Sequence, residues 1–352
     1  MPGDGIGPEI SDSTIQVLEV LNRKLELGII FETHEIGLSR LPKDGSTFPD
    51  EVLDAARAAD GIILGPVSHS DYPSRDKGGI NGSAHLRVQF DLYANIRPCR
   101  SREGIQSYGR TPLDLVIVRE NTEGFYADRT MYMGTGEFMP TPDVAIAMRK
   151  VTAKGSRRIA KAGFELARTR PRRKLTYVHK INVLKTSDAL FLKECRAVAA
   201  DYSDIATDDQ LIDSMTAMLV RDAQRFDVIV TTNMFGDILS DLASELSGSL
   251  GLGGAINAGD THCMAQAQHG SAPDIQGQDK ANPCSLILSA AMLLDWLADR
   301  RNLPVFRRAA EVIDRAVDQL VKSPETRTRD LGGQLGTRAF TERLCAEIEQ
   351  GL

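Results

Sequence analysis

Two aspartates follow the most strand-like segment of the chain, and their spacing suits a divalent cation. Asp237 and Asp241 lie four residues apart, after the β-branched run 226–233 and inside a stretch with helical periodicity. Residues four apart share one face of a helix, where two carboxylates repel each other unless a cation or a basic group lies between them. Carboxylate oxygens are ligands that Mg²⁺ and Mn²⁺ accept. A capping Asp237 with a solvated Asp241 would produce the same spacing, so both interpretations remain open.

Three arginines and two proton carriers lie in other apolar segments. Arg87 and Arg97 share the segment 86–98, and Arg119 ends an apolar run. Guanidinium groups bind carboxylates through two parallel hydrogen bonds, so converging arginines would suit a small di- or tricarboxylate. Tyr126 and Lys180 could exchange a proton if the fold brings them together. Each of these five residues could instead have a purely structural role.

The segments that must position these residues alternate between short β-type runs and longer helical ones. Strands are expected at 61–64, 113–118, 175–178 and 228–232. Helices are expected at 8–27, 50–59, 152–168, 187–200, 208–221, 237–250, 283–299 and 304–321. Such alternation predicts an α/β protein with a largely parallel central sheet.

Composition excludes several classes of function. The 352 residues are enough for two domains or one large one, and 48 acidic against 42 basic residues give a net charge of -6. This balance argues against nucleic acid or an anionic membrane surface as the main partner. The longest apolar stretch, 285–297, is too short to cross a bilayer, and the beginning of the sequence lacks the apolar core of a signal peptide.

The cysteines and glycine-rich loops exclude further classes. Five widely spaced cysteines without a C-x-x-C pair predict free thiols in a reducing cytoplasm. The turn 3–7 has the spacing G-x-G-x-G, which differs from the dinucleotide fingerprint G-x-G-x-x-G, and no P-loop motif occurs. We therefore expect a tight turn before a helix at this position, and neither a Rossmann nor a P-loop fold.

Several segments, in this order along the chain, resemble the β-decarboxylating dehydrogenases, the family of isocitrate and isopropylmalate dehydrogenases. They are PGDGIGPE (2–9), LRVQFDLYANIRP (86–98), VRENTEGFY (118–126), HKINVLK (179–185), FDVIVTTNMFGDILSD (226–241), GSLGL (248–252), HGSAPDIQGQDKANP (269–283) and RDLGG (329–333). The resemblance implies a two-domain α/β fold around a mixed, largely parallel sheet. Residues 1–98 plus 246–352 would form a large dinucleotide-binding domain, and 99–245 a small domain with dimer contacts. A homodimer with shared active sites is expected, and the segment 131–142 would clasp the second subunit.

The resemblance also implies roles for individual residues. Arg87, Arg97 and Arg119 would bind the malate part of a hydroxy di- or tricarboxylate. Tyr126 would protonate carbon after decarboxylation, and Lys180, from the second subunit, would assist removal of the hydroxyl proton. Mg²⁺ or Mn²⁺ would be held by Asp237 and Asp241 together with Asp213 of the second subunit. The dinucleotide would be bound by His269, Gly270, Ser271, Ala272, Asp274, Ile275 and Asn282.

Cofactor choice is predicted from Asp274 and Ile275. NADP-preferring relatives tend to carry Lys-Tyr there. An aspartate accepts hydrogen bonds from ribose hydroxyls and repels a 2′-phosphate, so we expect NAD.

Two departures from the family pattern concern the substrate and the cofactor. Isopropylmalate enzymes tend to place leucines around positions 83 and 84, whereas isocitrate enzymes tend to place Ser and Asn near 81 and 83. Asn81 and Ser83 have the polarity of the isocitrate enzymes in swapped order, which favours isocitrate or another polar 3-substituted malate. Isopropylmalate, D-malate and tartrate remain alternatives. Relatives usually have an aromatic residue and Glu where this chain has Ala265-Gln266, which would alter the NAD site or a salt bridge. A non-catalytic regulatory subunit is disfavoured, because the metal aspartates, the Tyr, the Lys and the arginines are all retained.

Overall fold

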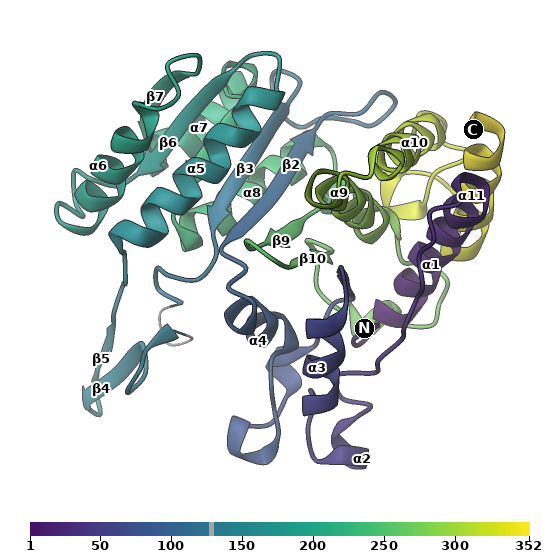
Figure 1. Ribbon diagram of the computed structural model, residues 1–352, viewed down its shortest axis with the longest axis horizontal. Coiled ribbons are helices and arrows are strands. Elements are labelled where there is room, and N and C mark those ends of the chain that lie inside the picture. Colours follow the sequence, from purple (N-terminus) through teal and green to yellow (C-terminus); the bar gives the residue numbers. More distant parts are fainter. Residues whose placement is uncertain (127–129) are drawn as a thin grey trace.

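The computed structural model describes residues 1–126 and 130–352 and has an eight-stranded sheet at its centre, in the order β1-β10-β9-β2-β3-β8-β6-β7 (Figure 1). The strands are β1 (Ile62–Leu64), β2 (Ala94–Arg100), β3 (Asp114–Glu120), β6 (Lys174–His179), β7 (Ala206–Leu211), β8 (Val228–Thr231), β9 (Ile256–Ala258) and β10 (Cys263–Gln266). Strands β3, β8, β6 and β7 run parallel, as does the pair β1/β10, and the pairs through β9 and β2 are antiparallel. The predicted α/β class with a mixed, largely parallel sheet is confirmed.

Helices cover both faces of the central strands, which explains the continuous apolar runs in the sequence. The helices are α1 (Gly7–Leu25), α2 (Leu41–Asp44), α3 (Asp50–Ala58), α4 (Gly82–Gln89), α5 (Ala153–Thr169), α6 (Ser187–Ala199), α7 (Ile212–Asp222), α8 (Asn233–Ser247), α9 (Cys284–Arg301), α10 (Pro304–Val321) and α11 (Thr337–Gly351). Val116 and Val118 of β3 pack with α5 and α6, and their neighbours Leu115 and Ile117 pack with α7 and α8. This two-residue alternation follows from the pleat of the strand.

A second core lies between α1, α9, α10 and α11, so that the first and last helices of the chain lie side by side (Figure 1). Helix α9 is buried along most of its length, as its apolar sequence predicts. Among the described residues, no helix is long and apolar enough to cross a membrane. All five cysteines are free thiols, as predicted.

Two expected helices begin at other residues. The segment predicted as a helix over 208–221 starts with β7, and α7 begins only at Ile212. Among the strands of the described residues, β7 pairs only with β6, and the side chains of Asp208 and Thr176 hydrogen bond across this pair at 2.5 Å. A polar edge strand lacks the apolar alternation that identifies a strand, which is why the pattern was misleading. Helix α8 begins at Asn233, four residues before the expected start.

Strands β2, β9 and β10 and helices α2, α4 and α11 were not predicted from the sequence. The apolar pattern of β2 is interrupted by Arg97 and Pro98. Pro98 is tolerated because β9 pairs only with residues 94–96, so Pro98 lies beyond that pairing.

A two-stranded hairpin, β4 (Glu137–Thr141) and β5 (Val144–Ala147), projects from the body of the molecule (Figure 1). The predicted arm over 131–142 is therefore placed too early, because its second strand lies after Pro142. Apolar side chains of the hairpin are exposed, among them Phe138, Met139 and Ile146. An exposed apolar surface of this kind is typical of a protein contact, so the clasp between subunits stays a prediction, as does the proposed division into two domains.

Candidate active site

A cavity of about 300 Å³ lies where α4, the strands β2 and β3, helix α8 and the segment 255–270 meet. All five predicted substrate residues line it although they are scattered over the sequence. The predicted site residues in its wall are Asn81, Ser83, Arg87, Arg97, Arg119, Tyr126, Asp237, His269 and Gly270. The tertiary structure thus brings three arginines, a phenol and a carboxylate to one volume of the size of a small metabolite.

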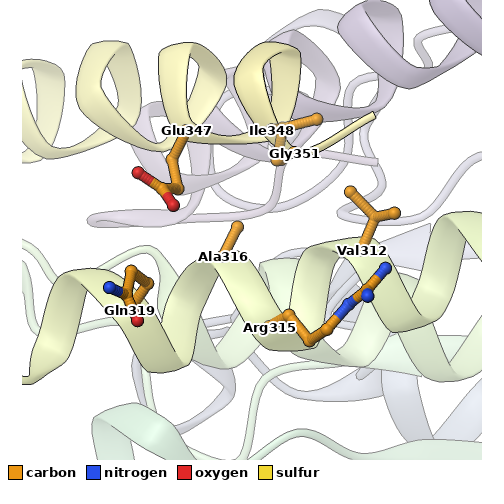
Figure 2. A pocket seen from close by; sticks show the side chains of 7 residues that line it. All are labelled: Val312, Arg315, Ala316, Gln319, Glu347, Ile348 and Gly351. Atoms are coloured by element: carbon orange, nitrogen blue, oxygen red, sulfur yellow. The ribbon is translucent and has the colours of Figure 1, made fainter.

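A second hollow lies between α10 and α11 (Figure 2). Its wall is formed by Val312, Arg315, Ala316, Gln319, Glu347, Ile348 and Gly351. It contains none of the predicted site residues, and its polar side chains do not form a convergent set.

Arg119 and Arg97 are held rigidly at the floor of the cavity. Both are buried, with 2% and 7% exposure. Arg119 on β3 donates from Nε and Nη2 to the side-chain oxygen of Asn233, at 3.0 and 2.6 Å, and from Nη1 to Asp237. Arg97 on β2 donates to Ser240 at 2.7 Å. Both arginines therefore connect their strands to helix α8, which packs against the sheet.

Gly236 allows this close approach of α8 to the sheet. A Cβ atom at this position would lie 2.6 Å from Cβ and Cγ of Arg119. The glycine therefore permits Asp237 to follow directly beside the guanidinium.

The two aspartates of α8 do not share one environment. Asp237 and Asp241 each have a carboxylate oxygen 3.3 Å from Nη1 of Arg97. Burial by itself would raise the pKa of Asp237, but Arg119, Arg97 and Arg87 hold that pKa below its usual value. Burial raises the pKa of Asp241, and repulsion from Asp237 adds to this. Since α8 begins at Asn233 with Thr232 as its N-cap, Asp237 lies in the second turn and does not cap the helix.

The oxygen ligands of these aspartates fit a hard divalent cation, but one chain does not complete its coordination. Six or more oxygen ligands are usual for such cations. Within residues 1–126 and 130–352, no group of three or more His, Cys, Asp and Glu side chains could hold a metal ion. Substrate oxygens, water and a second subunit would have to supply the remaining ligands.

Lys180 and Asp213 lie together but outside this cavity. Nζ of Lys180 is 2.6 Å from Oδ1 of Asp213, and this hydrogen bond holds the pKa of Asp213 below its usual value. The Asp213 side chain is 64% exposed. The carboxylate of Asp213 is therefore open to a neighbouring molecule, and the contribution of Lys180 and Asp213 to the site of a second subunit stays a prediction.

Tyr126 adjoins the aspartate that would hold the metal. Its hydroxyl donates to Oδ2 of Asp237 at 3.2 Å, and the guanidinium of Arg119 lies over its ring, 5.7 Å from the centroid. A phenol next to bound substrate and cation could deliver a proton there.

The predicted cofactor segment begins at the cavity and packs against the first glycine turn. His269 and Gly270 line the cavity, and burial lowers the pKa of His269, which favours the neutral ring. The carbonyl of Ser271 accepts a hydrogen bond from the backbone N–H of Ile6 at 2.8 Å. The side-chain hydroxyl of Ser271 hydrogen bonds with the hydroxyl of Ser68 at 2.7 Å. The turn 3–7 is thus the expected tight turn before a helix, and it also supports the loop that follows His269.

Asp4 anchors the same turn through three donors. Its carboxylate accepts the backbone N–H groups of Leu38 and Ser68, at 2.7 and 3.0 Å, and the hydroxyl of Tyr72 at 2.5 Å. Burial and, to a smaller extent, this hydrogen bond raise the pKa of Tyr72 far above its usual value.

The remaining residues of the predicted cofactor segment lie further along the chain. Ala272 has a φ of +37°, and Asp274 is exposed in the short helix Pro273–Ile275. Asn282 donates a hydrogen bond to Asp330 at 2.9 Å.

Gly5→Ala is expected to weaken NAD binding and to destabilise the fold. Gly5 has a φ of +58°, and an added Cβ would overlap the carbonyl of Ser271. Gly28→Ala is the matched control, since Gly28 has a φ of +70° with nothing within 4 Å. The control should lose only about 1–2 kcal/mol of unfolding free energy from backbone strain. Thermal unfolding and the KM for NAD measure the two effects. Equal behaviour of both variants would contradict a supporting role for the turn.

Two residues of the site were not singled out from the sequence: Asn233 orients Arg119, and Ser240 accepts from Arg97. Gln266, which was noted for its possible effect on the NAD site or a salt bridge, contacts Ser83 and Arg87 on the substrate side of the cavity. An asparagine directly after an apolar strand is a signal that could have indicated Asn233. Asn81, which was expected at the substrate, lines the cavity but also caps α4 by accepting the N–H of Ala84 at 3.1 Å.

Comparison with known proteins agrees with this arrangement. The family model described as isocitrate/isopropylmalate dehydrogenase matches residues 1–348. An isocitrate/homoisocitrate dehydrogenase of Thermus thermophilus is 42% identical over 349 residues, which cover 99% of this chain and 97% of that protein. A 3-isopropylmalate dehydrogenase of Archaeoglobus fulgidus is 38% identical, over 99% of this chain and 98% of the relative.

The fold is shared with solved structures as well. The crystal structure of isocitrate dehydrogenase from Methylococcus capsulatus superposes with a TM-score of 0.87 at 38% identity, covering 99% of this chain and 98% of that one. The matching family model and relatives, together with this fold and site, place the chain in a class of oxidoreductases that act on a hydroxy acid. The chain belongs to the isocitrate/isopropylmalate dehydrogenase family. The predicted resemblance and enzyme class are confirmed.

Proposed function

We propose that this protein oxidises and decarboxylates a 3-substituted (R)-malate, with NAD as acceptor and an isocitrate-like substrate favoured over 3-isopropylmalate, D-malate or tartrate. The observation that carries the proposal is the convergence of Arg87, Arg97 and Arg119 on one cavity with Asp237 and Tyr126. The three guanidinium groups carry more positive charge than the carboxylate of Asp237 can neutralise. They therefore suit a substrate with several carboxylates.

The roles of the chain's own residues follow from their positions. The arginines would bind and orient the carboxylates of the substrate. Lys180 of a second subunit would take the hydroxyl proton, and Tyr126 would return a proton to carbon after loss of CO₂. Asp237 and Asp241, with Asp213 of the second subunit, would hold Mg²⁺ or Mn²⁺, which supplies Lewis-acid stabilisation of negative charge on the substrate oxygens when bound. The bound dinucleotide would accept a hydride.

NAD is proposed as the acceptor because of the environment of Asp274. Its carboxylate is exposed in the turn Pro273–Ile275, beside the loop that lines the cavity. There it can accept hydrogen bonds from ribose hydroxyls, and like charge would reject a 2′-phosphate.

The wall around Ser83 supports a polar substituent on the substrate. Ser83, Asn81 and Gln266 all line the cavity on the side of α4. Ser83 already donates to Gln266, and Asn81 accepts the N–H of Ala84, so an isopropyl group would add no hydrogen bond to this wall. It would also separate these polar groups from water, which is unfavourable for a buried polar surface.

Reduction of the nicotinamide by the purified chain tests the proposal. With Mg²⁺, isocitrate, homoisocitrate, 3-isopropylmalate, D-malate and tartrate would each be offered with NAD and with NADP. We expect isocitrate or homoisocitrate to be used best, by about tenfold in kcat/KM, which equals about 1.4 kcal/mol of transition-state binding. A lower KM for NADP than for NAD would refute the cofactor assignment, and turnover of none of the substrates would refute the reaction.

A further inference from the structure

The turn that carries Lys180 is held by buried side chains on both sides. The backbone N–H of Lys180 donates to Oδ2 of Asp188 at 2.5 Å. The next N–H along the chain, that of Ile181, donates to Nδ1 of His179 at 3.3 Å. The carbonyl of Lys180 accepts the N–H of Leu184 at 2.8 Å. The backbone of the lysine is therefore a fixed starting point for its long and flexible side chain.

The carboxylate of Asp188 is shared between this turn and an arginine. Its Oδ2 atom accepts the N–H of Lys180, and its Oδ1 atom accepts from Nη1 of Arg149 at 2.5 Å. The side chains of Asp188 and Arg149 are 0% and 8% exposed. Such a buried ion pair adds little net stability, because the loss of hydration offsets the attraction between the charges. Its position beside Lys180 points to placement of the lysine as its role.

Arg149, which lies just after β5, extends the same anchor to helix α8. Its Nη2 atom donates to the hydroxyl of Thr232, the N-cap of α8, at 2.9 Å. The guanidinium also lies over the ring of Phe235, 5.4 Å from the centroid. Helix α8 carries Asp237, which lines the cavity of its own chain. The arginine thus joins the turn of Lys180, which would serve a second subunit, to the helix of Asp237, which serves its own chain.

We propose that Asp188 is a positioning residue for the active site of the second subunit, where it sets the direction from which the amine of Lys180 approaches the substrate hydroxyl. The inference rests on the proposed function and extends its machinery beyond the residues at the cavity. Neither Asp188 nor Arg149 is among the described residues that line the cavity. An effect of Asp188 on turnover must therefore pass through Lys180 or through Thr232 and α8.

Asp188→Asn is the first variant of the test. An amide has a single oxygen, so its NH₂ group must face either the N–H of Lys180 or the guanidinium of Arg149, and both are donors. We expect kcat to fall about 30-fold, since a displacement of about 1 Å at reacting groups can cost about 100-fold in rate. The KM for NAD should stay nearly unchanged. Initial rates would be measured with the hydroxy acid that the unmodified chain uses best.

Glu194→Gln is the matched control on the same helix. The Glu194 side chain is 6% exposed on α6 and pairs with Arg157 at 2.5 Å, far along the helix from the turn of Lys180. This variant also removes a buried charge from an ion pair, so it should lower the unfolding temperature as Asp188→Asn does. It should leave kcat unchanged.

Mixed dimers decide on which subunit's site Asp188 acts. When Asp188→Asn is paired with Tyr126→Phe, one site has an intact Tyr126 and receives a correctly placed Lys180. Such dimers should regain about half of full activity. When Asp188→Asn is paired with Lys180→Ala, one site lacks the lysine and the other receives a displaced one. No activity should return in this second pair, and two affinity tags isolate the mixed dimers.

A double variant keeps the test decisive if Asp188→Asn fails to fold. Arg149→Met combined with Asp188→Leu replaces the buried ion pair by apolar side chains and leaves no unpaired charge, so the chain should fold with nearly unchanged stability. The N–H of Lys180 still loses its acceptor. We expect the same fall in kcat and the same pattern in the mixed dimers.

Other outcomes overturn the inference in distinguishable ways. Unchanged kcat in Asp188→Asn and in the double variant would show that the carboxylate does not position Lys180. Activity that returns with Lys180→Ala but not with Tyr126→Phe would mean that Asp188 acts on the cavity of its own chain, through Thr232 and α8. Full activity of Lys180→Ala by itself would refute the proposed role of the lysine. Absence of turnover by the unmodified chain with every hydroxy acid offered would refute the proposed function itself.

Discussion

Asp237→Asn is expected to lower metal-dependent kcat/KM by about 10³-fold, equivalent to about 4 kcal/mol of lost transition-state stabilisation. The amide keeps the shape of the carboxylate but loses the charge that a divalent cation needs, and it lies beside Arg119 and the hydroxyl of Tyr126. The loss should depend on Mg²⁺ concentration, because part of it reflects weaker metal binding. Initial rates at a series of Mg²⁺ concentrations measure it.

Asp54→Asn provides the matched control for this loss. The Asp54 side chain lies on α3, is 75% exposed and pairs only with Arg57 among the ion pairs of the described residues. Removal of this charge should leave turnover unchanged, since exposed ion pairs contribute little. Far-UV circular dichroism and thermal unfolding should show that Asp237→Asn is folded. Activity within tenfold of the unmodified chain would remove Asp237 from the metal site.

Mixed dimers of Tyr126→Phe and Lys180→Ala are expected to regain activity that neither variant has alone. Each single variant should lose at least about 100-fold, the usual contribution of a general acid or base. Tyr126 lines the cavity of its own chain, whereas Lys180 lies outside that cavity. In a shared-site dimer that carries one variant in each subunit, one of the two sites contains both intact residues. Equal mixing should therefore restore about a quarter of full activity, because about half of the dimers are mixed.

The pair Tyr126→Phe with Asp237→Asn is the control for this experiment. Both residues line the cavity of one chain and are in contact at 3.2 Å, so every site of the mixed dimer lacks one of them. No activity should return. Co-expression with two different affinity tags isolates the mixed dimers. If mixed dimers of Tyr126→Phe and Lys180→Ala were inactive, each site would be formed by a single subunit.

Local sequence patterns were reliable where one face of a segment is apolar or a whole segment is buried. β8 and α10 were predicted almost to the residue, since a buried strand is a short β-branched run and an amphipathic helix repeats every 3.6 residues. β7 was misread because its residues are polar at the edge of the sheet, and β2 because an arginine and a proline interrupt it. In both strands the pairing of distant segments overrides local preference.

The sequence by itself determined the α/β class, the family and the chemistry that the residue types allow. The placement of Asp237 and Asp241 on one helix face followed from backbone geometry alone. Only the tertiary structure decided that Arg97 lies between these two aspartates, that Lys180 and Asp213 pair outside the cavity, and that Gln266 meets Ser83 across 183 positions of the chain. Contacts within a helix or strand are set by backbone sterics, which a sequence displays directly. Contacts between distant segments depend on how whole elements pack, and no local pattern records that packing.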